Sequence, residues 1–280
     1  MTTGHVETLR EGYVATLRFA NPPRHTLTAS MVAAMREQLA ALRGEPGLRV
    51  VVVRSATAGV FITHYEVDEL AQAAEQRASG AQAAASAAPG STVTARGSAP
   101  RLYPMHELIL EIESFPAVTV AAMDGLAMGG GLELALGCDF RLLCDGAHVV
   151  GLPETSVGII PGAGGTQRLS RLLGTARALD LILHGTLLAP KDALAAGVVH
   201  RVFDAARFDA EVAAFVSDIG SRAPIALAQA KLAVREGADL PLREALGLEQ
   251  AAFERTLAST DARLAMRAYL QGERYEWKGE

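Results

Sequence analysis

Residues 121–135 read Ala-Ala-Met-Asp-Gly-Leu-Ala-Met-Gly-Gly-Gly-Leu-Glu-Leu-Ala. The mostly apolar run at 117–122 predicts a buried strand, and residues 132–136 predict a short helix that begins after the glycines. Because glycine lacks a Cβ atom, the backbone at 129–131 can approach a ligand closely, and the free N–H groups at a helix start favour negative charge. The stretch therefore predicts an oxyanion site. The alternative is a tight strand-to-helix turn in which Glu133 complements the helix dipole.

A second glutamate, Glu154, follows Leu152-Pro153 and lies twenty-one residues after Glu133, too far for both to share one helix. A predicted strand at 138–144, a hairpin turn at Asp145-Gly146 and a returning strand at 148–151 would bring the chain back beside its starting point. Two carboxylates in one partly buried pocket push their pKa values apart, so that one serves as acid and the other as base. Taken alone, Glu154 would more often be a surface carboxylate.

The glycine-rich loop at 162–167, Gly-Ala-Gly-Gly-Thr-Gln, lacks the Gly-Lys-Ser/Thr ending of a P-loop and the third glycine of a dinucleotide fingerprint. We expect it to lead into a helix near Thr166 and to buttress Glu154. Ser156 has no Gly-x-Ser-x-Gly setting, and no His-Glu-x-x-His sequence occurs. The serine hydrolase and zinc peptidase classes therefore lack support.

The rest of the chain has an α/β rhythm. Alternation predicts a strand at 13–19, the apolar residues at 31, 35, 39 and 42 predict a helix over 30–43, and Val50–Val53 predicts a buried strand. From residue 166 onward the pattern is mostly helical, with stops at glycines and prolines. We interpret this C-terminal third as a helical cap or assembly surface.

The composition is that of a globular protein. The chain has 280 residues, of which 50% are hydrophobic and 20% charged, and its formal net charge is −5. These values exclude disorder as the main state, and a net acidic chain without a basic run gives little reason to expect nucleic-acid binding. The only cysteines, Cys138 and Cys144, build neither a disulfide framework nor a zinc site, which favours a reduced, cytoplasmic setting. No signal peptide or membrane span is expected.

One segment differs in composition. Between residues 71 and 100, twenty-one of the thirty residues are Ala, Ser, Gly or Pro. We interpret it as a flexible surface insertion, with a helix from Val67 continuing to about Ala78, and as a candidate lid.

The motifs resemble those of the crotonase, or enoyl-CoA hydratase/isomerase, superfamily. Residues 121–135 are similar to its A-x-x-G-x-A-x-G-G-G-x-E-L-A element, and residues 152–154 with 158–169 are similar to its second element. The resemblance implies an α/β spiral of ββα repeats over residues 1–200 and a helical region at 201–280 that assembles homotrimers or hexamers. It also implies an acyl-CoA thioester substrate and no metal or separate cofactor, because coenzyme A is part of the substrate.

The resemblance further implies the site residues. The thioester oxygen would lie between the backbone N–H groups of Gly130 and Tyr65, an arrangement worth roughly 3–4 kcal/mol per donor. Glutamates at both matched positions imply a hydratase, in which Glu133 deprotonates the water and Glu154 exchanges the proton at the α-carbon. A double-bond isomerase, a thioester hydrolase and a non-catalytic acyl-CoA-binding protein remain the alternatives.

The chain departs from the family at residues 61–67, Phe-Ile-Thr-His-Tyr-Glu-Val, where small residues usually flank the first donor. His64 and Tyr65 would reshape the acyl pocket, although a lone histidine there is more often a hydrogen-bonded structural residue. By the same resemblance, Trp277 and Lys278 would reach a neighbouring subunit's ligand, and Arg24 would meet a CoA phosphate or be solvated. The expected substrate-binding residues are Arg24, Thr26, Thr63, Val67, Gly129 and Pro153.

Overall fold

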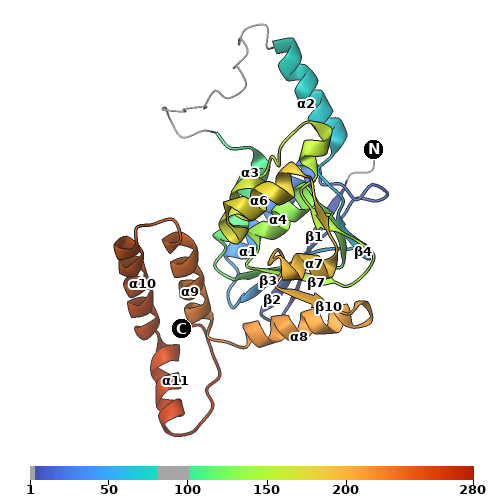
Figure 1. Ribbon diagram of the computed structural model, residues 1–280. Helices are drawn as coiled ribbons and strands as arrows, with labels where there is room; N and C mark the ends of the chain where they lie inside the picture. The colour runs from blue at the N-terminus through green and yellow to red at the C-terminus, as the bar shows by residue number, and fades with distance from the viewer. Residues whose placement is uncertain (1–3, 81–100) are drawn as a thin grey trace.

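The computed structural model describes residues 4–80 and 101–280. Ten strands in these ranges form two sheets (Figure 1). The large sheet contains β1 (His5–Glu11), β2 (Val14–Ala20), β3 (Val50–Ser55), β5 (Val118–Met123), β7 (Phe140–Cys144) and β10 (Arg201–Phe203), in that spatial order. The small sheet contains β4 (Gly59–Ile62), β6 (Gly125–Met128), β8 (Val150–Gly151) and β9 (Leu187–Leu188).

From β3 to β8, strands that follow one another in the chain alternate between the two sheets. β3, β5 and β7 run parallel in the large sheet, whereas β4, β6 and β8 run parallel in the small sheet. Asp124 alone separates β5 from β6, so the chain crosses between the sheets within one residue. A helical segment then follows each strand of the small sheet, and each strand-strand-helix turn repeats beside the last. This is the spiral of ββα repeats.

The helical segments cover the sheets and extend beyond them. The bounds of those before residue 200 are α1 (Ala29–Arg43), α2 (Val67–Gly80), α3 (Pro104–Glu113), α4 (Gly130–Gly137), η2 (Glu154–Val157), α5 (Gly165–Leu173), α6 (Thr175–Leu183) and α7 (Pro190–Ala195). After residue 200 come η3 (Ala205–Arg207), α8 (Phe208–Gly220), α9 (Pro224–Gly237), α10 (Leu242–Leu257) and α11 (Thr260–Leu270). The helix predicted over 30–43 is α1, and Thr28 caps it by accepting a hydrogen bond from the Met31 amide at 3.3 Å.

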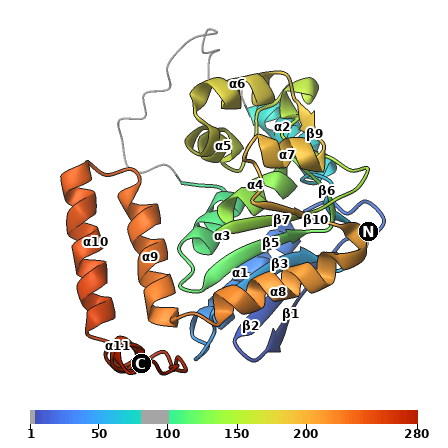
Figure 2. The same cartoon turned by 60° about the horizontal axis from the view of Figure 1, so that its bottom comes forward.

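Each face of the large sheet has its own core. Val51 and Val53 of β3 point into the main core, which α1, α3 and α4 cover. Val50 and Val52 point to the opposite face, which α8 covers with Phe208, Val212 and Val216. Figure 2 shows α8 lying across that face. Burial on both faces explains the continuous valine run of β3.

Helices α9, α10 and α11 stand to one side of the sheets (Figures 1 and 2). They expose large apolar side chains, among them Leu242 at 75%, Phe253 at 60% and Leu270 at 84%. β10 and α8, which follow residue 200, instead pack on the large sheet. In this structure the separate helical region therefore begins at α9, and its role in assembly stays a prediction.

Two expectations about the chain path are corrected. The hairpin predicted at Asp145-Gly146 is wrong, because β7 pairs with β5 and β10 in the large sheet whereas β8 pairs with β6 and β9 in the small sheet. The short strands β9 and β10 also interrupt the region predicted as helical. The predicted helix from Val67 is confirmed as α2, but residues 81–100 of the proposed insertion and lid lie outside the described residues.

Candidate active site

The candidate site lies where the small sheet ends. β4, β6 and β8 are parallel, so their carboxyl ends meet at one edge. Tyr65 follows β4, Gly129 and Gly130 follow β6, and Glu154 follows β8. α4 begins at Gly130 and carries Glu133 in its first turn. The topology therefore brings together the four residues that the sequence assigned to catalysis and to the oxyanion hole.

The two predicted oxyanion donors lie side by side. A Cβ atom placed on Gly130 would be 3.5 Å from the backbone nitrogen of Tyr65 and 3.3 Å from its Cβ. Within residues 4–80 and 101–280, neither the Tyr65 amide nor the Gly130 amide donates to a protein acceptor. Glycine is needed before the donor, because Gly129 has φ +49° and its amide donates to the Gly151 carbonyl at 2.9 Å.

Glu133 is a buried carboxylate held by backbone amides. Its side chain belongs to a residue that is only 2% exposed, and its Oε1 accepts hydrogen bonds from the amides of Ala163 at 2.8 Å and Gly165 at 2.7 Å. Burial raises the pKa of Glu133, while these two hydrogen bonds and the positive charge of Arg168 oppose the rise. Both bonds end on Oε1, so Oε2 receives no protein donor from the described residues.

Glu154 shares the pocket but has a different environment. A Cβ atom on Gly129 would lie 3.0 Å from Oε1 of Glu154, which places this carboxylate beside the turn into α4. Burial raises the pKa of Glu154 to about 7, its own backbone amide opposes the rise, and the charge of Glu133 adds to it. Its Oε2 is buried without a hydrogen-bond partner among the described residues. The two glutamates are thus electrostatically coupled, and only one of them is clamped.

The glycine-rich loop at 162–167 plays a different part from the one predicted. We expected it to buttress Glu154, but its amides hold Glu133 instead. A Cβ atom on Gly165 would lie 2.9 Å from Oε1 of Glu133, so glycine permits the close approach. The loop residues Ala163 and Gly165 were missed as site residues, although the two free amides of a Gly-Ala-Gly-Gly turn before a helix were a usable signal.

Three of the residues expected to bind substrate form a separate polar cluster. Arg24 is exposed and pairs with Glu66 at 3.1 Å and Asp68 at 2.8 Å. Thr26 is buried, and its hydroxyl donates to Glu66 at 2.7 Å. The Thr63 hydroxyl donates to the Arg24 carbonyl at 2.9 Å. These side chains hold the loop before α1 against the start of α2, and their contact with a substrate stays a prediction.

His64 and Tyr65, the bulky residues at which the chain departs from the family pattern, make hydrogen bonds within the protein. His64 forms a 2.8 Å hydrogen bond through Nδ1 with the Tyr65 carbonyl. The Tyr65 hydroxyl donates to Glu69 at 2.8 Å, and burial raises the pKa of that hydroxyl. His64 still borders the site, because its Cβ is 3.8 Å from the place of a Cβ on Gly129.

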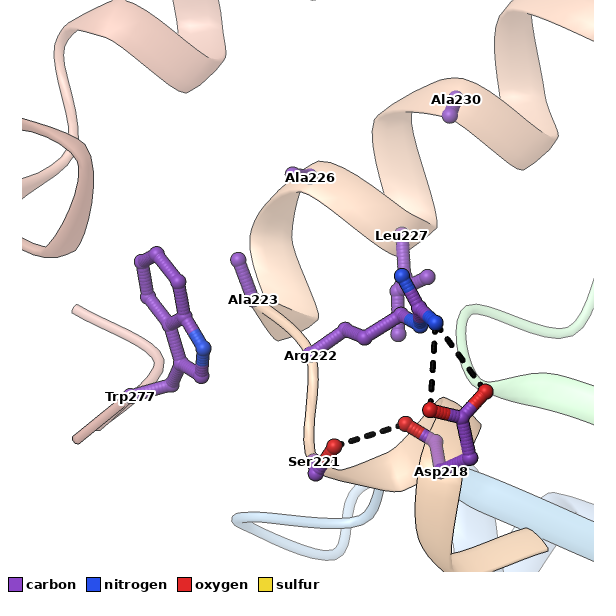
Figure 3. Close-up of a pocket in the computed structure, with 8 residues that line it drawn as sticks. All are labelled: Asp218, Ser221, Arg222, Ala223, Ala226, Leu227, Ala230 and Trp277. Carbon is purple, nitrogen blue, oxygen red and sulfur yellow. Dashed lines mark hydrogen bonds and ion pairs between the residues drawn. The ribbon is translucent and has the colours of Figure 1, made fainter. Parts of the chain in front are cut away.

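Of the other expected substrate-binding residues, Gly129 and Pro153 adjoin the glutamates, and Val67 is exposed at the first residue of α2. Trp277 and Lys278 belong to the C-terminal tail. Trp277 lines a hollow of about 620 Å³ beside α8 and α9 (Figure 3), which contains neither glutamate. Its carbonyl accepts a hydrogen bond from Arg49 at 2.7 Å.

Two further findings concern the described ranges alone. No group of three or more His, Cys, Asp or Glu side chains there is arranged to hold a metal ion. None of the helices there is both long and apolar enough to cross a bilayer. Both cysteines are free and buried. The cytoplasmic setting and the lack of a cofactor stay predictions.

Solved structures share this architecture. The crystal structure of an enoyl-CoA hydratase from Geobacillus kaustophilus superposes with a TM-score of 0.86 at 27% identity, covering 99% of this chain and 100% of the other. The alternation of strands between two sheets and the C-terminal helices together define a crotonase fold. The predicted fold class is therefore confirmed.

The comparison of sequences gives the family. The family model for enoyl-CoA hydratase/isomerase matches residues 95–280. The enoyl-CoA hydratase domain-containing protein 2 of Bos taurus, a mitochondrial protein, is 35% identical over 92% of this chain and 81% of its own length. An enoyl-CoA isomerase/hydratase of Mycosarcoma maydis is 41% identical over 61% of this chain, and the match spans 62% of that relative's length. The chain belongs to the enoyl-CoA hydratase/isomerase family of the crotonase superfamily.

Proposed function

We propose that this protein is an enoyl-CoA hydratase, which adds water across the α,β-double bond of an acyl-CoA thioester. The observation that carries the proposal is the pair of glutamates, buried Glu133 and half-buried Glu154, at the turn that presents two unused backbone amides. Membership of the family supports an acyl-CoA substrate. Relatives and structural neighbours named as hydratases support this reaction, but the names do not separate it from isomerisation.

The oxyanion hole would be the Tyr65 and Gly130 amides. When water adds to the β-carbon, electron density moves onto the thioester oxygen and forms an enolate. Two fixed N–H dipoles stabilise that charge without reorganising, and removing one such donor typically lowers kcat by about 10²–10³. A backbone donor does not depend on its side chain. The bulky Tyr65 therefore suits this role as well as a small residue would.

The two glutamates would divide the proton transfers. Glu133 acts on the water, because the Ala163 and Gly165 amides and Arg168 favour its ionised form and its Oε2 is left for the water. Glu154, with a pKa of about 7, is substantially protonated at neutral pH. It therefore delivers a proton to the α-carbon as the enolate collapses. A pair of carboxyl groups whose environments push their pKa values apart suits this division.

The test is the loss of the conjugated enoyl-thioester absorbance when crotonyl-CoA or a longer analogue is added. We expect Glu133→Gln to lower kcat by about 10²–10⁴-fold, since it removes the general base. Its affinity for a saturated acyl-CoA should be nearly unchanged in calorimetry. Full activity of Glu133→Gln would show that the base is wrongly assigned.

Double-bond isomerisation is the second candidate, and one observation favours it. Among the proposed catalytic and oxyanion residues, Glu154 combines a pKa near neutrality with an unpartnered buried oxygen, as a shuttle that moves a proton between two carbons requires. An isomerase would convert a 3-enoyl-CoA to the conjugated 2-enoyl-CoA, so absorbance would rise. Its rate would survive Glu133→Gln and be lost in Glu154→Gln.

The exposed apolar side chains of α9, α10 and α11 support assembly of this chain into homotrimers or hexamers. In the single chain, Leu246 is 51% exposed and Tyr269 is 83% exposed. Leu242, Phe253 and Leu270 on the same helices are exposed to a similar degree. Large apolar side chains that are exposed together on a group of helices often mark a protein interface. Light scattering coupled to gel filtration would give the mass, and a monomer at micromolar concentration would contradict the proposal.

A further inference from the structure

Arg168 on α5 is connected to Glu133 through one intervening residue, Ala163. Its Nη1 donates to the Ala163 carbonyl at 3.0 Å, and the Ala163 amide in turn donates to Glu133 at 2.8 Å. Gly164 leaves the room for this contact, because any Cβ there would fall on the guanidinium. The loop residue Ala163 is thus gripped on one side by a guanidinium and points its amide at the carboxylate on the other.

Glu113, at the end of α3, fixes Arg168 in turn. Nε and Nη2 of Arg168 donate to the two carboxylate oxygens at 2.9 Å and 2.7 Å, a two-pronged pair with defined orientation. The Arg168 side chain is 14% exposed and that of Glu113 is 22% exposed, so solvent screens this pair less than a surface pair.

The same Glu113 also contacts the C-terminal helices. Arg235 on α9 donates to Glu113 at 3.3 Å and to Asp139 at 2.9 Å. Lys231, one turn earlier on α9, pairs with Asp139 at 2.7 Å. These contacts place α9 in one charged network with Glu113 and Arg168, which support Glu133.

We propose that Arg168 is a positioning residue for Glu133: clamped by Glu113, it fixes the loop at 163–165 so that two amides hold the carboxylate, and Arg235 ties this support to α9. The inference rests on the proposed function for its catalytic consequence. The charged groups coupled to Glu133 are Glu154 from η2 and Arg168 from α5, and Glu113 and His106 from α3 interact with Arg168. Arg168 is the one among them whose charge favours the ionised form of Glu133.

The test compares Arg168→Gln with Arg168→Lys. The glutamine removes both the positive charge and the paired hydrogen bonds to Glu113, which we call the fork. We therefore expect the pKa of Glu133 to rise by about one unit or more. The acid limb of the rate profile should move to higher pH by the same amount, and kcat should fall about 10–100-fold with KM little changed. The lysine keeps the charge but cannot make the fork, so the pKa should rise less while kcat still falls.

Arg171→Gln is the matched control. Arg171 lies on the same helix, is exposed, and contacts Gln167 and Asp239 instead of residues 163–165. The pKa of Glu133 is read without turnover, from the pH-dependent infrared difference band of its carboxyl group, assigned by the loss of that band in Glu133→Gln.

A titration of Glu133 in Arg168→Gln that matches Arg171→Gln would overturn the inference and leave the proposed function standing. A wild-type protein that turns over no enoyl-CoA would refute the function, while the infrared titration still decides the role of Arg168. If Arg168→Gln does not fold, Arg168→Lys decides: wild-type kcat together with a wild-type pH profile contradicts the proposal.

Discussion

The environment of Glu154 predicts that removing its charge stabilises the fold at high pH. Burial raises the pKa of this carboxyl from its ordinary 4.5 to about 7 in the folded state. Between these values the folded protein binds the proton more tightly than the unfolded chain does. The free energy of unfolding therefore falls as the pH rises from 4.5 through 7, and the loss is complete above 7. Glu154→Gln carries no such penalty.

The magnitude follows from the two pKa values. The folded-state pKa exceeds the ordinary value by about 2.5, and each pKa unit corresponds to about 1.36 kcal/mol. The pH-dependent loss in the free energy of unfolding is therefore at most about 3.4 kcal/mol. Glu154 is partly exposed, and solvent screening reduces this to roughly 1.5–2 kcal/mol. The side-chain amide of Glu154→Gln would also lack a hydrogen-bond partner at the position of the buried Oε2, which lowers the free energy of unfolding. That cost does not depend on pH. The test is therefore the pH dependence of the difference between the two proteins.

Urea denaturation at pH 4.5, 6, 7 and 8, at one fixed protein concentration, measures this difference. We expect the stability of Glu154→Gln relative to wild type to rise by roughly 1.5–2 kcal/mol from the lowest to the highest pH. Glu75→Gln on the exposed face of α2 serves as control and should show no such trend. If the stability of Glu154→Gln relative to wild type stays constant or falls as the pH rises, the raised pKa assigned to Glu154 is refuted.

Two more predictions concern packing and the tail. Gly131→Ala should destabilise the fold by about 1–3 kcal/mol in urea denaturation, because its Cβ would lie 2.6 Å from the Ile62 carbonyl oxygen, whereas Gly247→Ala, in open space on α10, should be neutral or slightly stabilising. Equal effects of the two would contradict this. Asp261→Ala should free the C-terminal tail, whose Lys278 amide donates to Asp261 at 3.0 Å, and limited proteolysis should then cleave the tail faster. Unchanged cleavage would show that other contacts hold it.

The sequence predicted the elements that repeat locally. The helix at 30–43 and the strand at 50–53 follow from side-chain spacing alone, and both are present as α1 and β3. The family motifs also placed Glu133, Glu154, Tyr65 and Gly130 in one site, where the structure brings them together. Such predictions succeed because periodicity and motif spacing are encoded within a few residues.

What escaped prediction depends on distant parts of the chain. Residues 148–151 carry no local mark that sends them to the small sheet, so the Asp-Gly turn favoured a hairpin that does not form. The fork between Arg168 and Glu113 joins residues fifty-five positions apart, and no spacing rule connects them. The burial of Thr26 and its hydrogen bond to Glu66 depend on how the start of α2 packs, and its contact with a substrate stays a prediction.

The chemistry proposed here depends on treating two similar side chains differently. Glu133 is buried and Glu154 is half-buried, and burial alone would raise both pKa values and leave two poor bases. The loop at 163–165 breaks this symmetry, because it supplies two amides to one carboxylate and none to the other within the described residues. In the proposed mechanism these amides favour the ionised form of Glu133 against the rise in pKa that its burial causes, and the charge of Glu133 raises the pKa of Glu154. On that proposal one glycine-rich turn would distinguish the base from the acid, and Gly165 and Arg168 would belong to the functional site although neither would meet the substrate.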